Sequence, residues 1–121
     1  MSYAAYASVQ TAAETPSDLE FRAISHITRN LMEANKPGTV PLDRTRALNG
    51  NMRLWSLLVQ DLSSPGNKLP DALKARYISL GLFARRTSFK ALRDKSDLSL
   101  LIRLNTDVLD ALDRQRQTKA A

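Results

Sequence analysis

Apolar residues recur at intervals of three and four along most of this chain, which is the repeat of a helix with one buried face. The first such helix is predicted from Thr15-Pro16 to Ala34, because Thr15 can cap the free N–H groups and Pro16 suits the first turn. The breaker-rich segment 35–41 predicts a loop, and a second helix is predicted over 42–62. A tight turn is expected over 63–67.

A third helix is predicted from near Pro70 toward Phe89, and a fourth from a cap at Ser96 to about Arg116. No segment alternates with period two, so we predict an all-α fold: a compact bundle of about four helices with a short N-terminal helical or frayed segment. We expect a single domain over 1–121, with flexible ends at 1–14 and 115–121.

The N-terminal segment is rich in alanine and has a weak helical period. Tyr3, Tyr6 and Val9 are spaced by three residues, which suggests docking on this domain or on a partner.

One stripe on each later helix is predicted to form the structural core. Its members are Leu48, Met52, Trp55, Val59, Tyr77, Leu80, Leu101, Asn105 and Leu109.

Several apolar residues lie off these stripes. At 100° per residue, Leu54 and Leu57 leave the stripe of the second helix, while Ile78 and Leu82 lie away from that of the third. Two explanations are open: the third helix is central and buried all round, or the off-stripe residues form an exposed apolar groove for another helix. In the second case Leu54, Leu57, Ile78 and Leu82 are the candidate partner-binding residues.

Composition narrows the chemistry. The chain has 121 residues, no cysteine and one histidine, His26, so neither a cysteine nucleophile nor a multi-histidine metal site is expected. Phosphate-binding and nucleophile-elbow motifs are missing, and we predict no enzyme activity, no cofactor, no metal and no small-molecule substrate. With neither a secretory signal nor a long apolar run in the sequence, the expected location is cytoplasmic, without membrane insertion.

The net charge of +6 is concentrated late in the chain, where residues 81–121 hold nine basic and five acidic residues. Arg85, Arg86, Lys90 and Arg93 are a candidate basic patch, which is either an ordinary solvated face or a surface for an anionic partner. The patch lacks clustered charge and a stacking platform, so direct nucleic-acid binding is not the favoured interpretation.

Four segments resemble the bacterial FlaF family. ALNGNMRLW at 47–55 resembles its A-L-x-x-N-x-R-L-W core, and the DL and NKLP of 61–70 resemble its D-L…N-x-L-P turn. YISLGLF at 77–83 resembles its apolar central helix, and LIRLN at 101–105 its L-I-x-x-N segment. The Pro/Gly-rich loop at 35–41 and the ending LDAL at 109–112, without the glycine expected there, depart from the pattern.

The resemblance implies a flagellar biosynthesis regulator that binds newly made flagellin and supports its secretion and filament assembly, as an export chaperone does. It implies flagellin as a partner, together with the regulator FlbT. The alternative that it leaves open is post-transcriptional control of flagellin synthesis, acting on mRNA or through FlbT. A scaffold that self-associates through the apolar surface is a third possibility.

Overall fold

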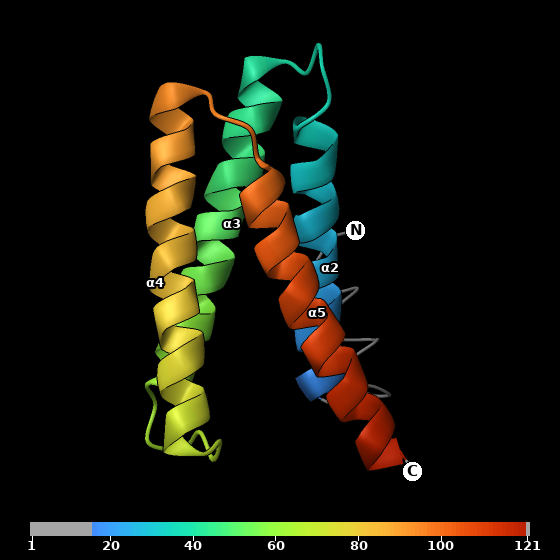
Figure 1. Cartoon of the computed structure of the whole chain (residues 1–121), viewed down its shortest axis with the longest axis vertical. Coiled ribbons are helices and arrows are strands. Elements are labelled where there is room, and N and C mark those ends of the chain that lie inside the picture. The colour runs from blue at the N-terminus through green and yellow to red at the C-terminus, as the bar shows by residue number, and fades with distance from the viewer. Residues whose placement is uncertain (1–15, 121) are drawn as a thin grey trace, which may run out of the picture.

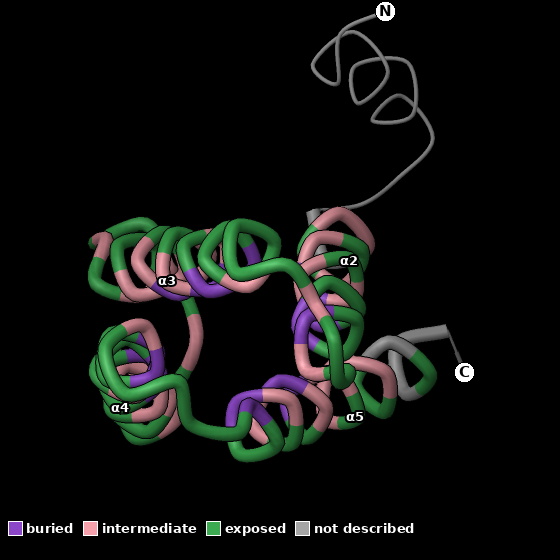
Figure 2. The backbone as a smooth tube through the Cα atoms, turned by 90° about the horizontal axis from the view of Figure 1, so that it is seen from above, coloured by how far each residue is buried: buried purple, intermediate pink, exposed green. Residues whose placement is uncertain are grey.

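The computed structural model describes residues 16–120, in which it contains four helices: α2 (Pro16–Ala34), α3 (Pro41–Leu62), α4 (Asp71–Asp94) and α5 (Ser99–Ala120). Each helix runs antiparallel to the next, and seen from above the four stand at the corners of one bundle (Figures 1 and 2). The predicted all-α bundle is confirmed for the described range. The predictions for the N-terminal segment and for Thr15 as a cap lie outside that range.

The bounds of α4 and α5 correct the sequence prediction. α4 passes Phe89 and ends at Asp94, where Lys95 takes a left-handed φ of 55° and its N–H bonds to the carbonyl of Ala91. α5 begins at Ser99 rather than Ser96, because the carboxylate of Asp97 accepts a hydrogen bond from the Ser99 N–H (2.6 Å). α5 also continues past its predicted end near Arg116 to Ala120, since the following residues lack a proline or glycine to end it.

Polar contacts between distant segments close one end of the bundle. The side-chain oxygen of Asn35, just after α2, accepts a hydrogen bond from the N–H of Leu98, just before α5 (2.9 Å). The guanidinium of Arg44 at the start of α3 donates to the carbonyls of Ala91 and Ser96. The loops 35–40 and 95–98 are therefore tied together across the same end.

Full burial is confined to the part of the bundle near this closed end. The last fully buried residues toward the other end are Ile24 in α2, Trp55 in α3, Gly81 in α4 and Val108 in α5. Beyond this level every described residue is half-buried or exposed. We call the part up to and including this level the closed half and the part beyond it the open half.

Small residues let α4 lie close to α3 in the closed half. Gly81, Ala84, Ser88 and Ala91 are all buried, at the spacing of one helix face. A Cβ atom on Gly81 would collide with Cγ2 of Val59 and lie only 3.1 Å from Cε3 of Trp55. The absence of a side chain at Gly81 is therefore what permits this approach.

A buried chain of hydrogen bonds joins three helices. The Trp55 indole N–H donates to Oδ1 of Asn105 (2.9 Å), and the Asn105 amide donates to Oδ1 of Asn51 (2.8 Å). The Asn51 amide donates to Oγ of Ser88 (3.0 Å), whose hydroxyl donates to the carbonyl of Ala84 (2.7 Å). This polar relay ties α5 and α4 to α3 with its buried groups paired.

The predicted core divides between the two halves. Leu48, Trp55, Leu101 and Asn105 are fully buried, as predicted. The rest of the predicted core is only half-buried: Val59, Tyr77, Leu80 and Leu109 lie beyond the last buried level, and Met52 lies in the closed half between Asn51 and Trp55.

Candidate partner-binding surface

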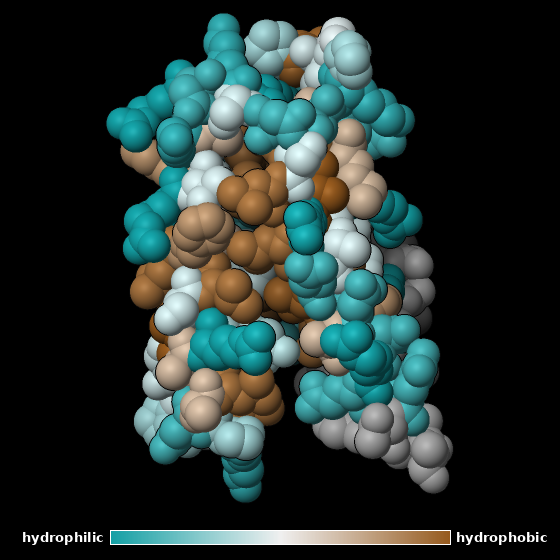
Figure 3. All heavy atoms as spheres, viewed as in Figure 1, coloured by the Kyte–Doolittle hydropathy of each residue, from teal (hydrophilic) through white to brown (hydrophobic). Residues whose placement is uncertain are grey.

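The side of the bundle between α4 and α5 is its loosest side. These two helices pack against each other much less closely than the other neighbouring pairs, and they diverge toward the end where α5 finishes (Figure 1). The space-filling view of this side shows apolar side chains gathered between the two helices, with a notch below them (Figure 3).

We call the notch the open cleft and define it by the half-buried apolar residues that α3, α4 and α5 contribute to the open half. They are Leu58, Leu62, Leu73, Tyr77, Leu80, Leu109 and Leu112. Most of them pack against the buried core on one side, yet each keeps part of its surface in solvent. Large apolar side chains that stay partly in water on one side of a protein are typical of a protein-interaction site.

The four residues predicted to bind a partner do not form one surface. Gly50 faces Ile27 of α2, and Leu54 and Leu57 share its helix face at i+4 and i+7. Ile78 and Leu82 instead flank Gly81, which faces α3. Partner binding by these residues stays a prediction, for two separate surfaces rather than one groove.

The central-helix explanation for α4 is wrong over its outer side. Leu82, Phe83 and Phe89 are exposed, with 40%, 39% and 55% of their surface in solvent. A helix buried by neighbours all round would cover these side chains. Leu57 on α3 is also exposed, at 56%.

The predicted basic patch lies on this same outer side of α4. Arg85, Arg86, Lys90 and Arg93 are all exposed, and the Arg93 guanidinium lies over the ring of Phe89, 5.3 Å from its centroid. Because Arg93 covers one face of Phe89, the ring is a poorer platform for stacking a base. From Ala72 to Arg93 the helix carries cations but no carboxylate.

Two acidic side chains, Glu20 and Asp61, lie in the open half. Packed surroundings raise the pKa of the Glu20 carboxyl, and the nearby Asp61 carboxylate raises it further, although much of the Glu20 side chain is in solvent. Asp61 accepts a hydrogen bond from the Asn67 side-chain amide (3.1 Å). The start of α2 therefore lies beside the end of α3 and its turn.

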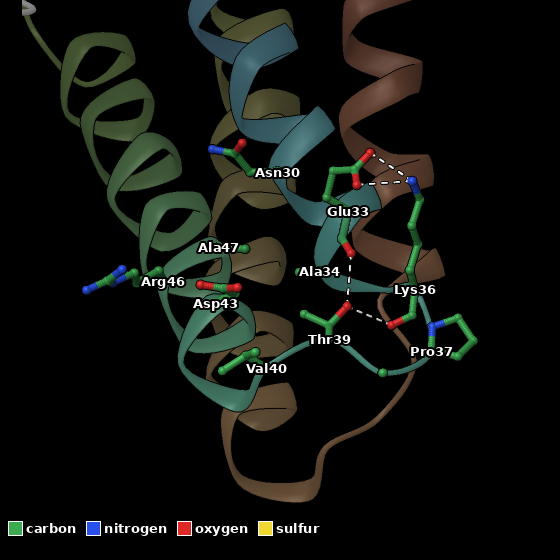
Figure 4. Close-up of a pocket in the computed structure, with 11 residues that line it drawn as sticks. Asn30, Glu33, Ala34, Lys36, Pro37, Thr39, Val40, Asp43, Arg46 and Ala47 are labelled. Atoms are coloured by element: carbon green, nitrogen blue, oxygen red, sulfur yellow. Dashed lines mark hydrogen bonds and ion pairs between the residues drawn. The ribbon is translucent and has the colours of Figure 1, made fainter.

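An open hollow of about 610 Å³ lies beside the loop of the closed end. Figure 4 shows the polar groups of the loop side paired with one another: Lys36 forms an ion pair with Glu33 (3.0 Å), and the Thr39 hydroxyl hydrogen-bonds to the carbonyls of Glu33 (3.1 Å) and Lys36 (2.7 Å). These contacts hold the loop in place. We assign the hollow to the loop structure rather than to ligand binding.

The described residues show neither a cluster of metal ligands nor a membrane-spanning helix. Among residues 16–120, no group of three or more His, Cys, Asp or Glu side chains is placed to hold a metal ion. His26 is exposed and lies 3.5 Å from the Asn30 side-chain amide. No helix in the described range is long and apolar enough to cross a membrane.

The open cleft is the feature that helix periodicity could not identify. Tyr77, Leu80 and Leu109 follow the core stripes, and a stripe indicates a face toward the bundle axis in either half. One signal was present: on the same face of α4, large residues before Gly81 give way to small ones after it. That change marks where the neighbouring helix comes close.

Comparison with known protein families gives one match. The chain matches the family described as flagellar protein FlaF over residues 2–112, which includes all the segments that form the relay and the open cleft. No match was found among curated proteins or among solved structures. The match covers most of the sequence, and the chain therefore belongs to the FlaF family of flagellar proteins.

Proposed function

We propose that this chain binds newly made flagellin through the open cleft and holds it in a state fit for secretion. The single observation that carries this proposal is that none of the large apolar residues which three helices contribute to the open half is fully buried. Membership of the FlaF family supports a role in the flagellum, and the open cleft supplies a surface on which that role can operate.

The chemistry of the partner fits such a surface. The terminal segments of flagellin become amphipathic helices on assembly and expose apolar stripes before export. An apolar helix face fits a groove between helices, where large side chains anchor at i, i+3, i+4 and i+7. Covering these stripes would keep flagellin from associating with itself before export.

The test compares two substitutions of the same kind at opposite ends. Leu73→Asp places a charge in the open cleft, whereas Leu100→Asp places one at an exposed site near the closed end. We expect Leu73→Asp to weaken flagellin binding at least tenfold and Leu100→Asp to leave it unchanged. Calorimetry measures the affinity, and circular dichroism checks that both variants fold.

Two results would count against the proposal: no flagellin binding by the unmodified chain, or full binding by a folded Leu73→Asp variant. Leu82→Asp, at an exposed residue of α4 outside the cleft, tests the surface predicted from periodicity. If Leu82→Asp alone abolishes binding, flagellin contacts the outer side of α4 instead of the open cleft.

The basic patch of α4 favours a second candidate function, the control of flagellin mRNA directly or through FlbT. Its exposed arginines and lysine could contact phosphates, since carboxylates are missing between Ala72 and Arg93. A gel shift with flagellin leader RNA at increasing salt tests the direct form. Binding that weakens steeply with salt and is lost in Arg86→Ala/Lys90→Ala would support it, and no binding at low salt would exclude it.

A further inference from the structure

The N-terminal segment joins the bundle at the open half. α2 begins at Pro16, and its first turns lie beside the end of α3, as the electrostatic coupling between Glu20 and Asp61 indicates. The end of α5 is at the same end of the bundle (Figure 1). Residues 1–15 are thus joined to the bundle at the end where the open half lies, far from the closed end.

The composition of this segment suits an apolar cleft better than water. It carries no charged side chain before Glu14, and Tyr3, Tyr6 and Val9 recur every third residue among alanines. Aromatic side chains bury a large area, and a tyrosine hydroxyl can stay at the wet edge of a groove. Because residues 1–13 carry no charged side chain, they cannot form ion pairs with the cationic residues of α4. Their apolar residues can instead pack against the leucines of the cleft.

The length of the segment also fits. In a helical conformation residues 3–13 would be roughly 15 Å long, and the open half of α4 from Asp71 to Leu80 measures about 14 Å at the same rise per residue. Glu14 and Thr15 remain as a link to Pro16. A link this short gives the tethered segment an effective concentration on the order of millimolar at a neighbouring site.

We propose that residues 3–13 occupy the open cleft of their own chain and are displaced when flagellin binds. This inference rests on the proposed function, since it makes the N-terminal segment a competitor at the same site. A segment that fills the cleft in nine chains out of ten reduces the apparent affinity for a ligand about tenfold. The chain then hides its apolar surface until a partner takes the segment's place.

Docking of the segment can be measured without flagellin. The sequence contains no cysteine, so spin labels on Ser8→Cys and Ala72→Cys, at the exposed start of α4, report one distance. We expect a short, narrow distance distribution that broadens on Tyr3→Ala/Tyr6→Ala but not on the matched control Ser2→Ala/Thr11→Ala. Ser8→Cys paired with Thr45→Cys, at the closed end, should give a longer distance.

Two distance results would overturn docking in cis. One is a broad distribution that the tyrosine substitutions leave unchanged. The other is a short distance that appears only between two singly labelled chains, since the segment would then fill the cleft of a second copy.

Competition is measured by flagellin affinity. Removal of residues 2–14 should raise the affinity about tenfold, Tyr3→Ala/Tyr6→Ala should raise it similarly, and Ser2→Ala/Thr11→Ala should not. Equal or weaker binding by the shortened chain would overturn the competition. If no variant binds flagellin, the proposed function fails, while the label distances still decide whether the segment docks.

Discussion

The closed and open halves use the same four helices in opposite ways. In the closed half α4 presents small residues, from Gly81 to Ala91, and these are fully buried against α3. In the open half the same helix presents Leu73, Tyr77 and Leu80, and none of them is fully buried. The largest apolar side chains on this face of α4 lie where they are least covered, which is the reverse of what a purely structural helix would need.

This contrast separates two tasks. The closed half has the tied loops, the close α3–α4 approach and the polar relay, and it supplies most of the packing. The open half is held in position by helices that continue from it. Its leucines are therefore presented to a partner by a rigid base rather than by a flexible loop.

The largest expected effect comes from removing the centre of the relay. Asn105→Ala leaves the Trp55 N–H and the Asn51 carbonyl buried without partners, so we expect a loss of about 3 kcal/mol in the free energy of unfolding. Asn67→Ala, in the turn of the open half, removes hydrogen bonds that solvent can replace, and should cost about 1 kcal/mol or less. Urea unfolding measures both. Equal losses would mean that the two halves do not differ in this way.

Two leucines of α5 give a matched comparison of packing. Leu101 is 1% exposed in the closed half, and Leu101→Ala should cost about 3 kcal/mol. Leu109 is half-buried in the open half, so Leu109→Ala should cost about 1 kcal/mol. The same unfolding experiment decides, and a larger loss for Leu109 would show that the open half is closed in solution.

Two glycines test how closely the helices approach. Gly81→Ala forces a Cβ atom against Val59 and Trp55, and we expect it to cost about 2 kcal/mol. At Gly50 the new Cβ would lie 3.3 Å from Cδ1 of Ile27, the movable end of that side chain. The gain in helix propensity, up to about 1 kcal/mol, should make Gly50→Ala neutral or stabilising. Destabilisation by Gly50→Ala and not by Gly81→Ala would contradict the α3–α4 contact.

The smallest effects are those of pH, and their signs differ between the two ends. The raised pKa of Glu20 means that its charged form is disfavoured in the folded chain, so this penalty disappears as the pH falls through that pKa. The side chain and then the amide of Ser99 lower the pKa of Asp97, so the stability that Asp97 contributes is present above its unfolded pKa and lost as the pH falls through the folded one.

Neutral substitutions check these two signs. At pH 7 Glu20→Gln should raise stability and Asp97→Asn should lower it, and at pH 3 both differences should shrink, as measured by urea unfolding. Shifts of the same sign at pH 7 would refute the contrast between the ends.

The helices were predictable because their signals are local. Pro16, Pro41 and the breakers after Ala34 and Leu62 place the bounds of α2 and α3 closely. The start of α5 was missed because Asp97, rather than Ser96, accepts the hydrogen bond at its first residue. Asn35, 63 residues earlier in the chain, also binds the Leu98 N–H, and no local pattern reveals that contact. The end of α4 was missed because lysine, rather than glycine, adopts the left-handed conformation.

The sequence predicted that some apolar surface is exposed, but it did not predict which residues form the open cleft. Apolar residues in excess of one stripe indicated an uncovered surface, and Leu57 and Leu82 are indeed exposed. The open cleft, however, is made of residues on the stripes themselves, such as Tyr77 and Leu109. Whether a stripe is covered depends on the distance between helices, which Gly81 and its small neighbours set for the closed half alone.

The polar relay also determines what the fluorescence of Trp55 reports. Trp55 is the sole tryptophan, and its ring is buried against Gly81 with the indole N–H bonded to Asn105. Its fluorescence will therefore report the unfolding of the closed half. A ligand that binds among the leucines beyond Trp55 should leave that emission nearly unchanged. Constant tryptophan emission in a titration where calorimetry reports binding would therefore indicate that the cleft is occupied while the closed half stays intact.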